Sequence, residues 1–300
     1  MNIEIRNLTV RFGRTTAIDD LTLTLPAGKI YGLLGRNAAG KTTLLSVLAA
    51  FRRPSAGRVL IDGADPYENP RIVERICFVG QRLIGQDDDS VKTVLGLARA
   101  LRPGWDQSYA DRLLDRFEVP RRKSVSSLSQ GKHSALGIVL GLASRAPLTI
   151  LDESYLGLDA PSRYGFYEEL LADYVANPRT VILSTHLIEE VGSLFEEVVI
   201  IDRGRLVLHE ETDVLRARGA SVTGPAEAVD RFVDGLTVLS EQRLGPTKSA
   251  TVYGRLGPER DLAARALDLE LGPVGLQDLF IHLTRDGIAR VDQPMEGTRS

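Results

Sequence analysis

One stretch of eight residues limits what this chain can fold into more than any other. "GRNAAGKT", Gly35–Thr42, follows the short apolar run "KIYGLL" and opens "KTTLLSVLAAF", in which apolar residues recur with helical spacing. Glycines allow the loop to turn so that successive backbone N–H groups face one anion. A buried strand, a glycine-containing loop and a helix in this order therefore predict a phosphate-binding loop in an α/β fold.

The residue types within this loop indicate a nucleoside triphosphate bound with a metal ion. We expect Lys41 to reach the β- and γ-phosphates and the Thr42 hydroxyl to hold Mg²⁺. A glycine turn followed by a surface lysine is the alternative, but it does not explain the strand before and the helix after. The residues expected to line the nucleotide are Gly35, Asn37, Ala38, Ala39, Gly40, Lys41, Thr42 and Thr43.

A second segment supplies the acidic groups that such a loop requires. In "LTILDES" an apolar strand ends in Asp152 and is followed at once by Glu153. The strand end places the Asp152 carboxylate at the sheet edge, where Mg²⁺ and its water ligands are expected. Neighbouring residues of a strand point in different directions, so we expect Glu153 to orient the attacking water.

The remaining pattern predicts a mostly parallel sheet with additions. Period-two alternation before residue 26 favours an antiparallel sheet, whereas short apolar runs alternating with helical segments favour a parallel sheet flanked by helices. The interval 89–143 contains only helical patterns. We therefore expect a nucleotide-binding domain over residues 1–215, with a helical subdomain inserted at about 82–143.

The pattern weakens after residue 207. "ETDVLRARGA" predicts one closing helix, and "GLQDLFIHLT" predicts an amphipathic helix because Leu276, Leu279, Phe280 and Leu283 share one face. We expect residues 216–300 to form a small α+β domain packed on the core or on a second copy. A regulatory or dimer-stabilising role is the alternative.

Composition excludes several classes of function. The 300 residues carry a net charge of −3, which argues against general affinity for nucleic acid. The single cysteine, Cys77, lies in an apolar run and forms no internal disulfide, so a reducing cytoplasmic setting is expected. No secretory signal is visible, and the apolar stretch Leu136–Ala143 is far shorter than the roughly 20 residues that span a bilayer.

With these motifs in this order, residues 1 to about 215 resemble the ATP-binding cassette (ABC) ATPases. The resemblance implies that Phe12 stacks on adenine and that Gln81 links the Mg²⁺ site to the helical subdomain. It also implies that His186 of "LSTHLIEE" contacts the γ-phosphate and that Asp159 of "LGLDA" crosses to the other subunit. Taken singly, each of these residues has an ordinary structural explanation, and the ordered set does not.

"SLSQGK" resembles the signature of this family, usually LSGGQ. In the family, a signature serine and glycine, here Ser129 and Gly131, contact ATP bound to the opposite subunit. Gln130 and Lys132 depart from the pattern; a side chain at position 130 requires negative φ or an outward orientation, and Lys132 places a positive charge near an anion. Two further departures are Ala38, where glycine is usual, and Ser154, where proline is usual.

The resemblance implies an ATPase that drives a separately encoded membrane permease, with ATP and Mg²⁺ as cofactors. "IYGLLGRN", "GLDAPSR" and "STHLIEE" look most like the ATPase subunits of bacterial multidrug or antibiotic exporters. The expected assembly is a homodimer, or a heterodimer with a related subunit, at the inner face of the cell membrane. A hydrolysis-impaired nucleotide-binding partner and a soluble, non-transport ABC ATPase are the alternatives.

Overall fold

The computed structural model describes residues 1–80, 89–254 and 256–285. They divide into two compact units. The first contains Met1–His186 and Ser193–Leu206, and the second contains Leu187–Gly192 and the chain from Val207 onward. This division falls earlier in the chain than the boundary expected near residue 215. Gln81 lies outside the described residues.

An antiparallel sheet forms one layer of the first unit. Its strand order is β2-β1-β4, with β1 at Ile3–Phe12, β2 at Thr15–Leu25 and β4 at Ala56–Ile61. Ile3, Ile5, Leu8 and Val10 of β1 are buried, and most residues between them are not. The sheet therefore has one apolar face, as the period-two alternation predicts.

The second sheet has strand order β5-β6-β7-β3-β8-β9. Its strands are β3 (Ile30–Leu34), β5 (Ile76–Val79), β6 (Leu148–Asp152), β7 (Thr180–Thr185), β8 (Glu197–Asp202) and β9 (Arg205–Glu211). The pairs β5–β6, β6–β7, β7–β3 and β3–β8 are parallel, which confirms the predicted fold class. The loops after β3, β6 and β7 thus leave the same edge of the sheet, where ligands bind in open α/β sheets.

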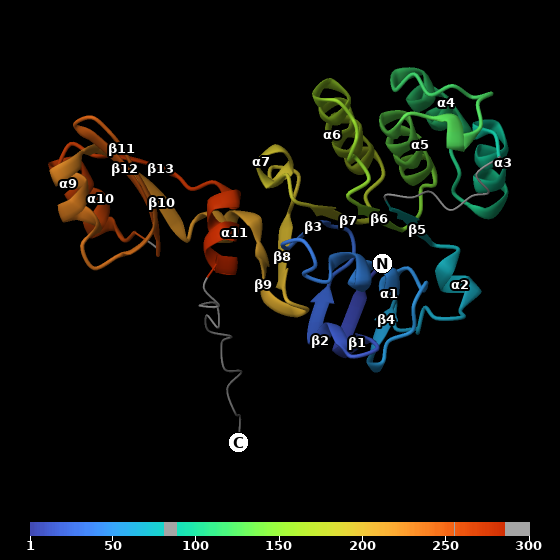
Figure 1. Ribbon diagram of the computed structural model, residues 1–300, viewed down its shortest axis with the longest axis horizontal. Coiled ribbons are helices and arrows are strands. Elements are labelled where there is room, and N and C mark those ends of the chain that lie inside the picture. Colours follow the sequence, from blue (N-terminus) through green and yellow to red (C-terminus); the bar gives the residue numbers. More distant parts are fainter. Residues whose placement is uncertain (81–88, 255, 286–300) are drawn as a thin grey trace. The chain divides into compact units, whose positions relative to one another are not determined.

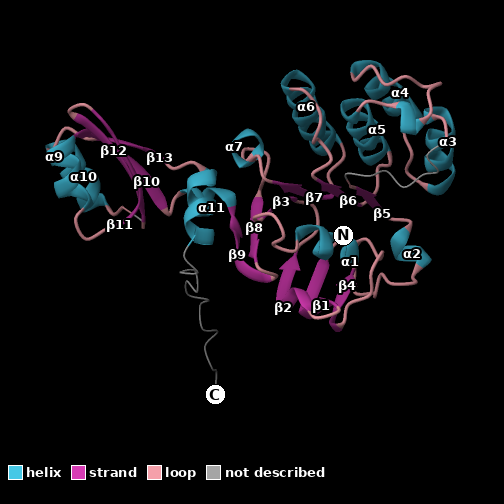
Figure 2. Cartoon of the chain, viewed as in Figure 1, coloured by secondary structure: helices cyan, strands magenta, loops and turns pink. Residues whose placement is uncertain are grey.

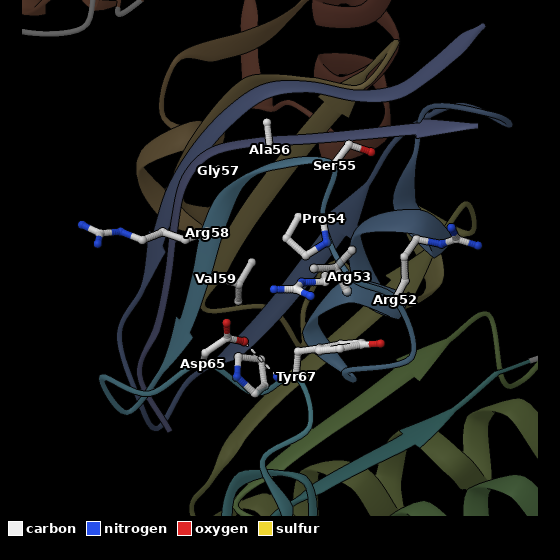
Figure 3. A pocket seen from close by; sticks show the side chains of 12 residues that line it. Arg52, Arg53, Pro54, Ser55, Ala56, Gly57, Arg58, Val59, Asp65 and Tyr67 are labelled. Atoms are coloured by element: carbon white, nitrogen blue, oxygen red, sulfur yellow. Dashed lines mark hydrogen bonds between the residues drawn. The ribbon is translucent and has the colours of Figure 1, made fainter. Parts of the chain in front are cut away.

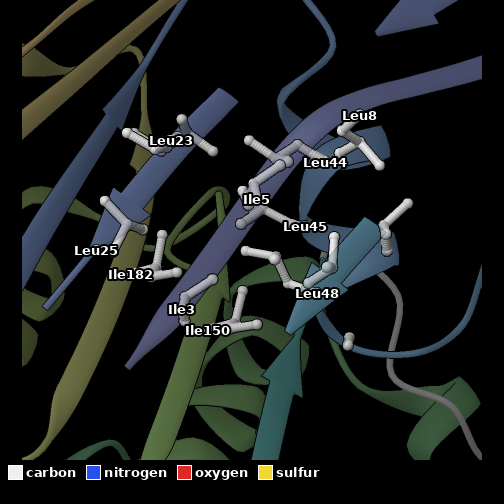
Figure 4. Packing of buried hydrophobic residues seen from close by; sticks show 14 of the residues in the cluster. Ile3, Ile5, Leu8, Leu23, Leu25, Leu44, Leu45, Leu48, Ile150 and Ile182 are labelled. Atoms are coloured by element: carbon white, nitrogen blue, oxygen red, sulfur yellow. The ribbon is translucent and has the colours of Figure 1, made fainter. Parts of the chain in front are cut away.

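Helix α1 (Lys41–Leu48) packs in the core between the antiparallel sheet and strands of the parallel sheet. Figure 4 shows Leu44, Leu45 and Leu48 among the side chains of Ile3, Ile5, Ile150 and Ile182. A short helix, α2 (Pro70–Val73), precedes β5. Because α1 begins directly at Lys41, this core fixes the position of the loop before it.

Between β5 and β6 the described chain is helical, as predicted. It contains α3 (Val91–Leu101), α4 (Gln107–Arg116), a 3₁₀ turn (Val125–Ser127) and α5 (Gln130–Ala143), which lie together in Figure 1. Ser90 caps α3 by accepting a hydrogen bond from Thr93 N–H at 3.1 Å. Helix α6 (Ala160–Ala176) follows β6. In the parts of the chain that the structure describes, no helix has both the length and the apolar composition to span a bilayer.

A buried ionic cluster lies where α5 ends and α6 passes. Asp173 of α6 accepts from Arg179 Nη2 at 2.5 Å and also pairs with Arg145. Its side chain is 1% exposed and that of Arg179 is 5% exposed. Burial lowers the pKa of Arg179 to about 10. Both arginines therefore share one carboxylate shielded from water, and Arg145 also pairs with Asp106 at 3.0 Å.

The second unit is a small α+β structure (Figure 2). It contains α7 (Ile188–Val191), α8 (Thr212–Arg216), α9 (Ala226–Val233), α10 (Pro258–Ala266) and α11 (Leu276–Arg285). Its antiparallel sheet has the order β11-β12-β10-β13, with β10 at Gly219–Pro225, β11 at Thr237–Leu244, β12 at Thr247–Tyr253 and β13 at Glu270–Pro273.

Two predicted helices of this unit have different outcomes. The closing helix predicted over 211–220 is short, because the chain turns into β10 at Gly219. The amphipathic helix near the end is confirmed as α11, in which Leu276, Leu279 and Leu283 are buried.

Candidate functional site

The loop between β3 and α1 is closed around its own lysine. Lys41 is 6% exposed, and its Nζ donates to the carbonyl oxygens of Gly35 at 2.7 Å and Arg36 at 3.3 Å. Gly40 has φ 105°, and a methyl group there would lie 2.6 Å from the Ala17 carbonyl oxygen. The loop therefore requires glycine at this position and holds a buried ammonium group where phosphates are expected.

Ala38 sits in the strained part of this loop. Its φ is 64°, which lies in the left-handed region that residues other than glycine disfavour. The departure of this residue from the family pattern therefore has a physical cost.

We expect Ala38→Gly to relieve this strain and raise the free energy of unfolding by about 1 kcal/mol. Urea unfolding followed by circular dichroism measures the change. Ala98→Gly in the middle of α3 is the matched control, and it should destabilise by about 0.5–1 kcal/mol instead. A loss of stability in Ala38→Gly would contradict the strain.

Asp152 ends β6 with an incompletely satisfied carboxylate. The residue is 3% exposed, and Oδ1 has no hydrogen-bond partner among the described residues. Burial raises the pKa of Asp152, while the hydroxyls of Thr42 and Ser184 and the charge of Lys41 oppose that shift. A buried carboxylate oxygen without a partner, beside a threonine hydroxyl, fits an oxygen-binding cation such as Mg²⁺.

Glu153 links the phosphate loop to the loop after β7. Its Oε1 lies 3.8 Å from Lys41 Nζ and 3.4 Å from His186 Nδ1. Its backbone φ is 48°, so the residue that follows the strand is in a strained conformation. The structure thus brings together three residues, Lys41, Glu153 and His186, that lie far apart in the sequence.

The signature segment opens α5 and contacts the loop before α6. Ser129 caps α5, accepting from Lys132 N–H at 3.4 Å. A methyl group on Gly131 would lie 2.8 Å from the Gly157 carbonyl oxygen, so glycine is needed for this close approach. Gln130 begins the helix, and its side chain packs against Gly157. Position 130 thus accommodates a side chain.

The Lys132 ammonium group has partners within its own helical subdomain. Its Nζ donates to the Phe117 carbonyl oxygen at 2.7 Å and pairs with Glu118 at 3.2 Å. Partners within the helical subdomain thus hold the ammonium group in this conformation, and a role for its charge toward a bound anion stays a prediction.

Asp159 caps α6, where its Oδ1 accepts from Ser162 N–H at 2.9 Å. A hydrogen bond with the Ser162 hydroxyl and this backbone hydrogen bond lower the pKa of Asp159. The predicted site residues thus form two groups. One surrounds Lys41 and Glu153, and the other, with Ser129, Gly131 and Asp159, lies at the starts of α5 and α6 beside Gly157.

Phe12 has a neighbour that the sequence did not indicate. The ring is 45% exposed, and the Arg52 guanidinium lies 4.2 Å from its centroid. This cation–π contact joins the end of β1 to the segment after α1. No motif marks Arg52, because only the packing of α1 under the antiparallel sheet brings the two residues together.

A small hollow of about 180 Å³ lies beside this segment. Figure 3 shows Arg53 lying near Tyr67, whereas the side chains of Arg52 and Arg58 point away on opposite sides. The guanidinium groups of these three arginines do not converge on the hollow.

The fold and the first group of residues define the class of protein. A parallel sheet with a phosphate loop after β3, a carboxylate pair at the end of β6 and a helical insertion before β6 is the arrangement of a phosphate-loop ATPase of the cassette type.

Comparisons with known proteins agree. The family model described as "ABC transporter" matches residues 18–155. The chain is 30% identical to the daunorubicin resistance ATP-binding protein DrrA3 of Streptomyces coeruleorubidus, over 92% of this chain and 93% of the relative. It is 27% identical to the ABC transporter ATP-binding protein YtrB of Bacillus subtilis, over 96% and 97%. The chain belongs to the ABC transporter family, as an ATPase.

Solved structures show the same fold. The ATP-binding subunit of an ABC transporter superposes with a TM-score of 0.64 at 23% identity, covering 72% of this chain and 92% of that one. A dimeric, post-hydrolysis ATP-binding cassette bound to ADP and Pi superposes with a TM-score of 0.62 at 20% identity, covering 70% and 98%.

Proposed function

We propose that two copies of this chain, or this chain and a related subunit, enclose two ATP molecules. The phosphate loop of one subunit and Ser129, Gly131 and Asp159 of the other complete each site. The observation that carries the proposal is the division of the site residues into two groups, one around Lys41 and one at the starts of α5 and α6. Dimeric cassettes among the structural neighbours support it.

The proposed reaction is attack of water on the γ-phosphate of ATP. Glu153 accepts the proton of the attacking water. His186, whose Nδ1 lies 3.4 Å from Glu153 Oε1, orients the Glu153 carboxylate. Lys41 exchanges its contacts with Gly35 and Arg36 for phosphate oxygens. Thr42 and Asp152 hold Mg²⁺, which neutralises phosphate charge when bound. Gln81, outside the described residues, is the third proposed ligand.

The Asp152→Asn variant distinguishes the proposed role of Asp152 in binding Mg²⁺ from its effect on the stability of the fold. A raised folded pKa means that the ionised carboxylate costs stability, and that this cost is present once the pH rises through that pKa. We expect the variant to be more stable at pH 7, by about 0.5–2 kcal/mol, and to lose Mg²⁺-dependent binding of ATP. Urea unfolding and fluorescent-ATP titration with and without Mg²⁺ measure the two effects. Wild-type Mg²⁺ dependence in the variant would contradict the role.

We propose that the chain drives a membrane permease and that transport is outward. The daunorubicin resistance protein and the bacitracin transport ATP-binding protein BcrA of Enterococcus faecalis, 30% identical over 74% of this chain and 73% of the relative, support an exporter. This role places the chain at the inner face of the membrane.

An apolar groove supplies the proposed permease contact. It measures about 320 Å³ and is lined by Phe51, Phe78, Leu97 and Leu101, among others. Phe51, Leu97 and Leu101 are each more than half exposed. The groove reaches Gly80, the residue before Gln81. An apolar side chain on a cytoplasmic segment of the permease fits this groove.

The mass of purified Glu153→Gln, measured by light scattering with and without Mg²⁺-ATP, tests the dimer. A monomer that becomes a dimer only with ATP supports the shared site. The double variant Glu153→Gln, Lys41→Ala is the control and should stay monomeric. A chain that binds ATP and remains monomeric would overturn the homodimeric site.

Two observations favour a second candidate, a nucleotide-binding partner with little hydrolysis. Ala38 is strained in the phosphate loop, and the buried Ser154 hydroxyl has no hydrogen-bond partner among the described residues. Steady ATP turnover by the purified chain would exclude this candidate.

A further inference from the structure

The helix that follows His186 packs with the C-terminal unit. The first compact unit ends at His186, and Leu187–Gly192, which includes α7, clusters with the chain from Val207 onward. Only Leu187 separates His186 from the first residue of α7, Ile188. The division between the two units therefore falls directly beside a proposed γ-phosphate contact.

Contacts within the C-terminal unit hold α7 in place. Gln277 Nε2 of α11 donates to Glu189 Oε1 of α7 at 3.1 Å. A methyl group built on Gly192 would lie 3.3 Å from Leu276 Cδ2 and 3.4 Å from Arg216 Nη2. The end of α7 is thus closely approached by both α11 and α8.

The apolar residues of α7 and the first residue of α11 are buried. Ile188 and Val191 of α7 are 2% and 0% exposed, and Leu276 at the start of α11 is 4% exposed. The close approach of Leu276 to Gly192 leaves little free volume at the end of α7, so a shift of α11 is transmitted to α7. One extended residue spans at most about 3.6 Å. Because only Leu187 lies between them, the backbone of His186 moves little without α7.

We infer that α11 positions His186 through α7, and that Leu276 and Gln277 are positioning residues for ATP hydrolysis. This inference rests on the proposed role of His186. It gives the C-terminal unit a function in catalysis. A movement of α11 changes the position of the His186 side chain relative to Glu153 and the γ-phosphate. Neither residue touches the nucleotide.

A charge exchange across the Gln277–Glu189 contact tests the inference without disturbing the core. Gln277→Glu places two carboxylates together, and we expect kcat for ATP hydrolysis to fall by about 3- to 10-fold with KM for ATP unchanged. The double variant Gln277→Glu, Glu189→Gln restores a hydrogen bond with donor and acceptor exchanged, and should return kcat to within about twofold. Gln242→Glu, an exposed glutamine of β11, is the matched control and should leave kcat unchanged.

A second measurement does not depend on turnover. The His186 imidazole resonance, assigned by its loss in His186→Gln, should shift in Gln277→Glu, return in the double variant and stay in place in Gln242→Glu. An unmoved resonance, or a kcat that does not change in Gln277→Glu, would overturn the inference. Full activity of His186→Gln would instead overturn the proposed role of His186, and the two failures are therefore distinguishable.

Discussion

Glu153→Gln should lower kcat for ATP hydrolysis by about 10²- to 10⁴-fold, the usual contribution of a general base. The amide keeps the shape of the side chain but does not accept the proton of the attacking water. ATP binding should persist, because the change removes a negative charge 3.8 Å from Lys41, the residue proposed to bind phosphate. Phosphate release at saturating ATP measures kcat, and fluorescent-ATP titration measures binding.

Glu74→Gln provides the matched control for this prediction. Glu74 is exposed at the end of α2, so the same chemical change there should leave kcat within about twofold of wild type. Hydrolysis by Glu153→Gln at the wild-type rate would show that another group takes the proton.

Asp173→Ala should lower the free energy of unfolding by about 3–5 kcal/mol, which is the usual cost of breaking a buried ion pair. The substitution removes the carboxylate that compensates the burial of Arg179, whereas Arg145 keeps its pair with Asp106. The loss is large because the Asp173 side chain is 1% exposed, so water does not replace it. Urea unfolding followed by circular dichroism measures the change.

Asp115→Ala is the control for this second prediction. Asp115 pairs with Arg121 at 3.0 Å, but the two side chains are 75% and 43% exposed. Removing this surface pair should cost less than about 1 kcal/mol. Equal stability of the two variants would show that burial does not set the strength of the Asp173 cluster.

Local sequence determined the parts of the site that lie within one strand–loop–helix segment. "KIYGLLGRNAAGKT" predicts a buried strand, a turn and a helix beginning at the lysine, and the structure has all three. The apolar run ending in Asp152 likewise predicts a carboxylate at the end of a buried strand. These predictions hold because hydrophobic spacing and glycine conformational freedom act over a few residues.

Contacts between distant segments were decided only by the tertiary structure. Arg52 meets Phe12, and Lys132 meets Phe117 and Glu118, because packing of helices and sheets brings these segments together. The same holds for α7, which follows His186 in sequence but packs with α8 and α11 in the C-terminal unit. A single sequence records which groups are available, and close packing of the folded core selects which of them meet.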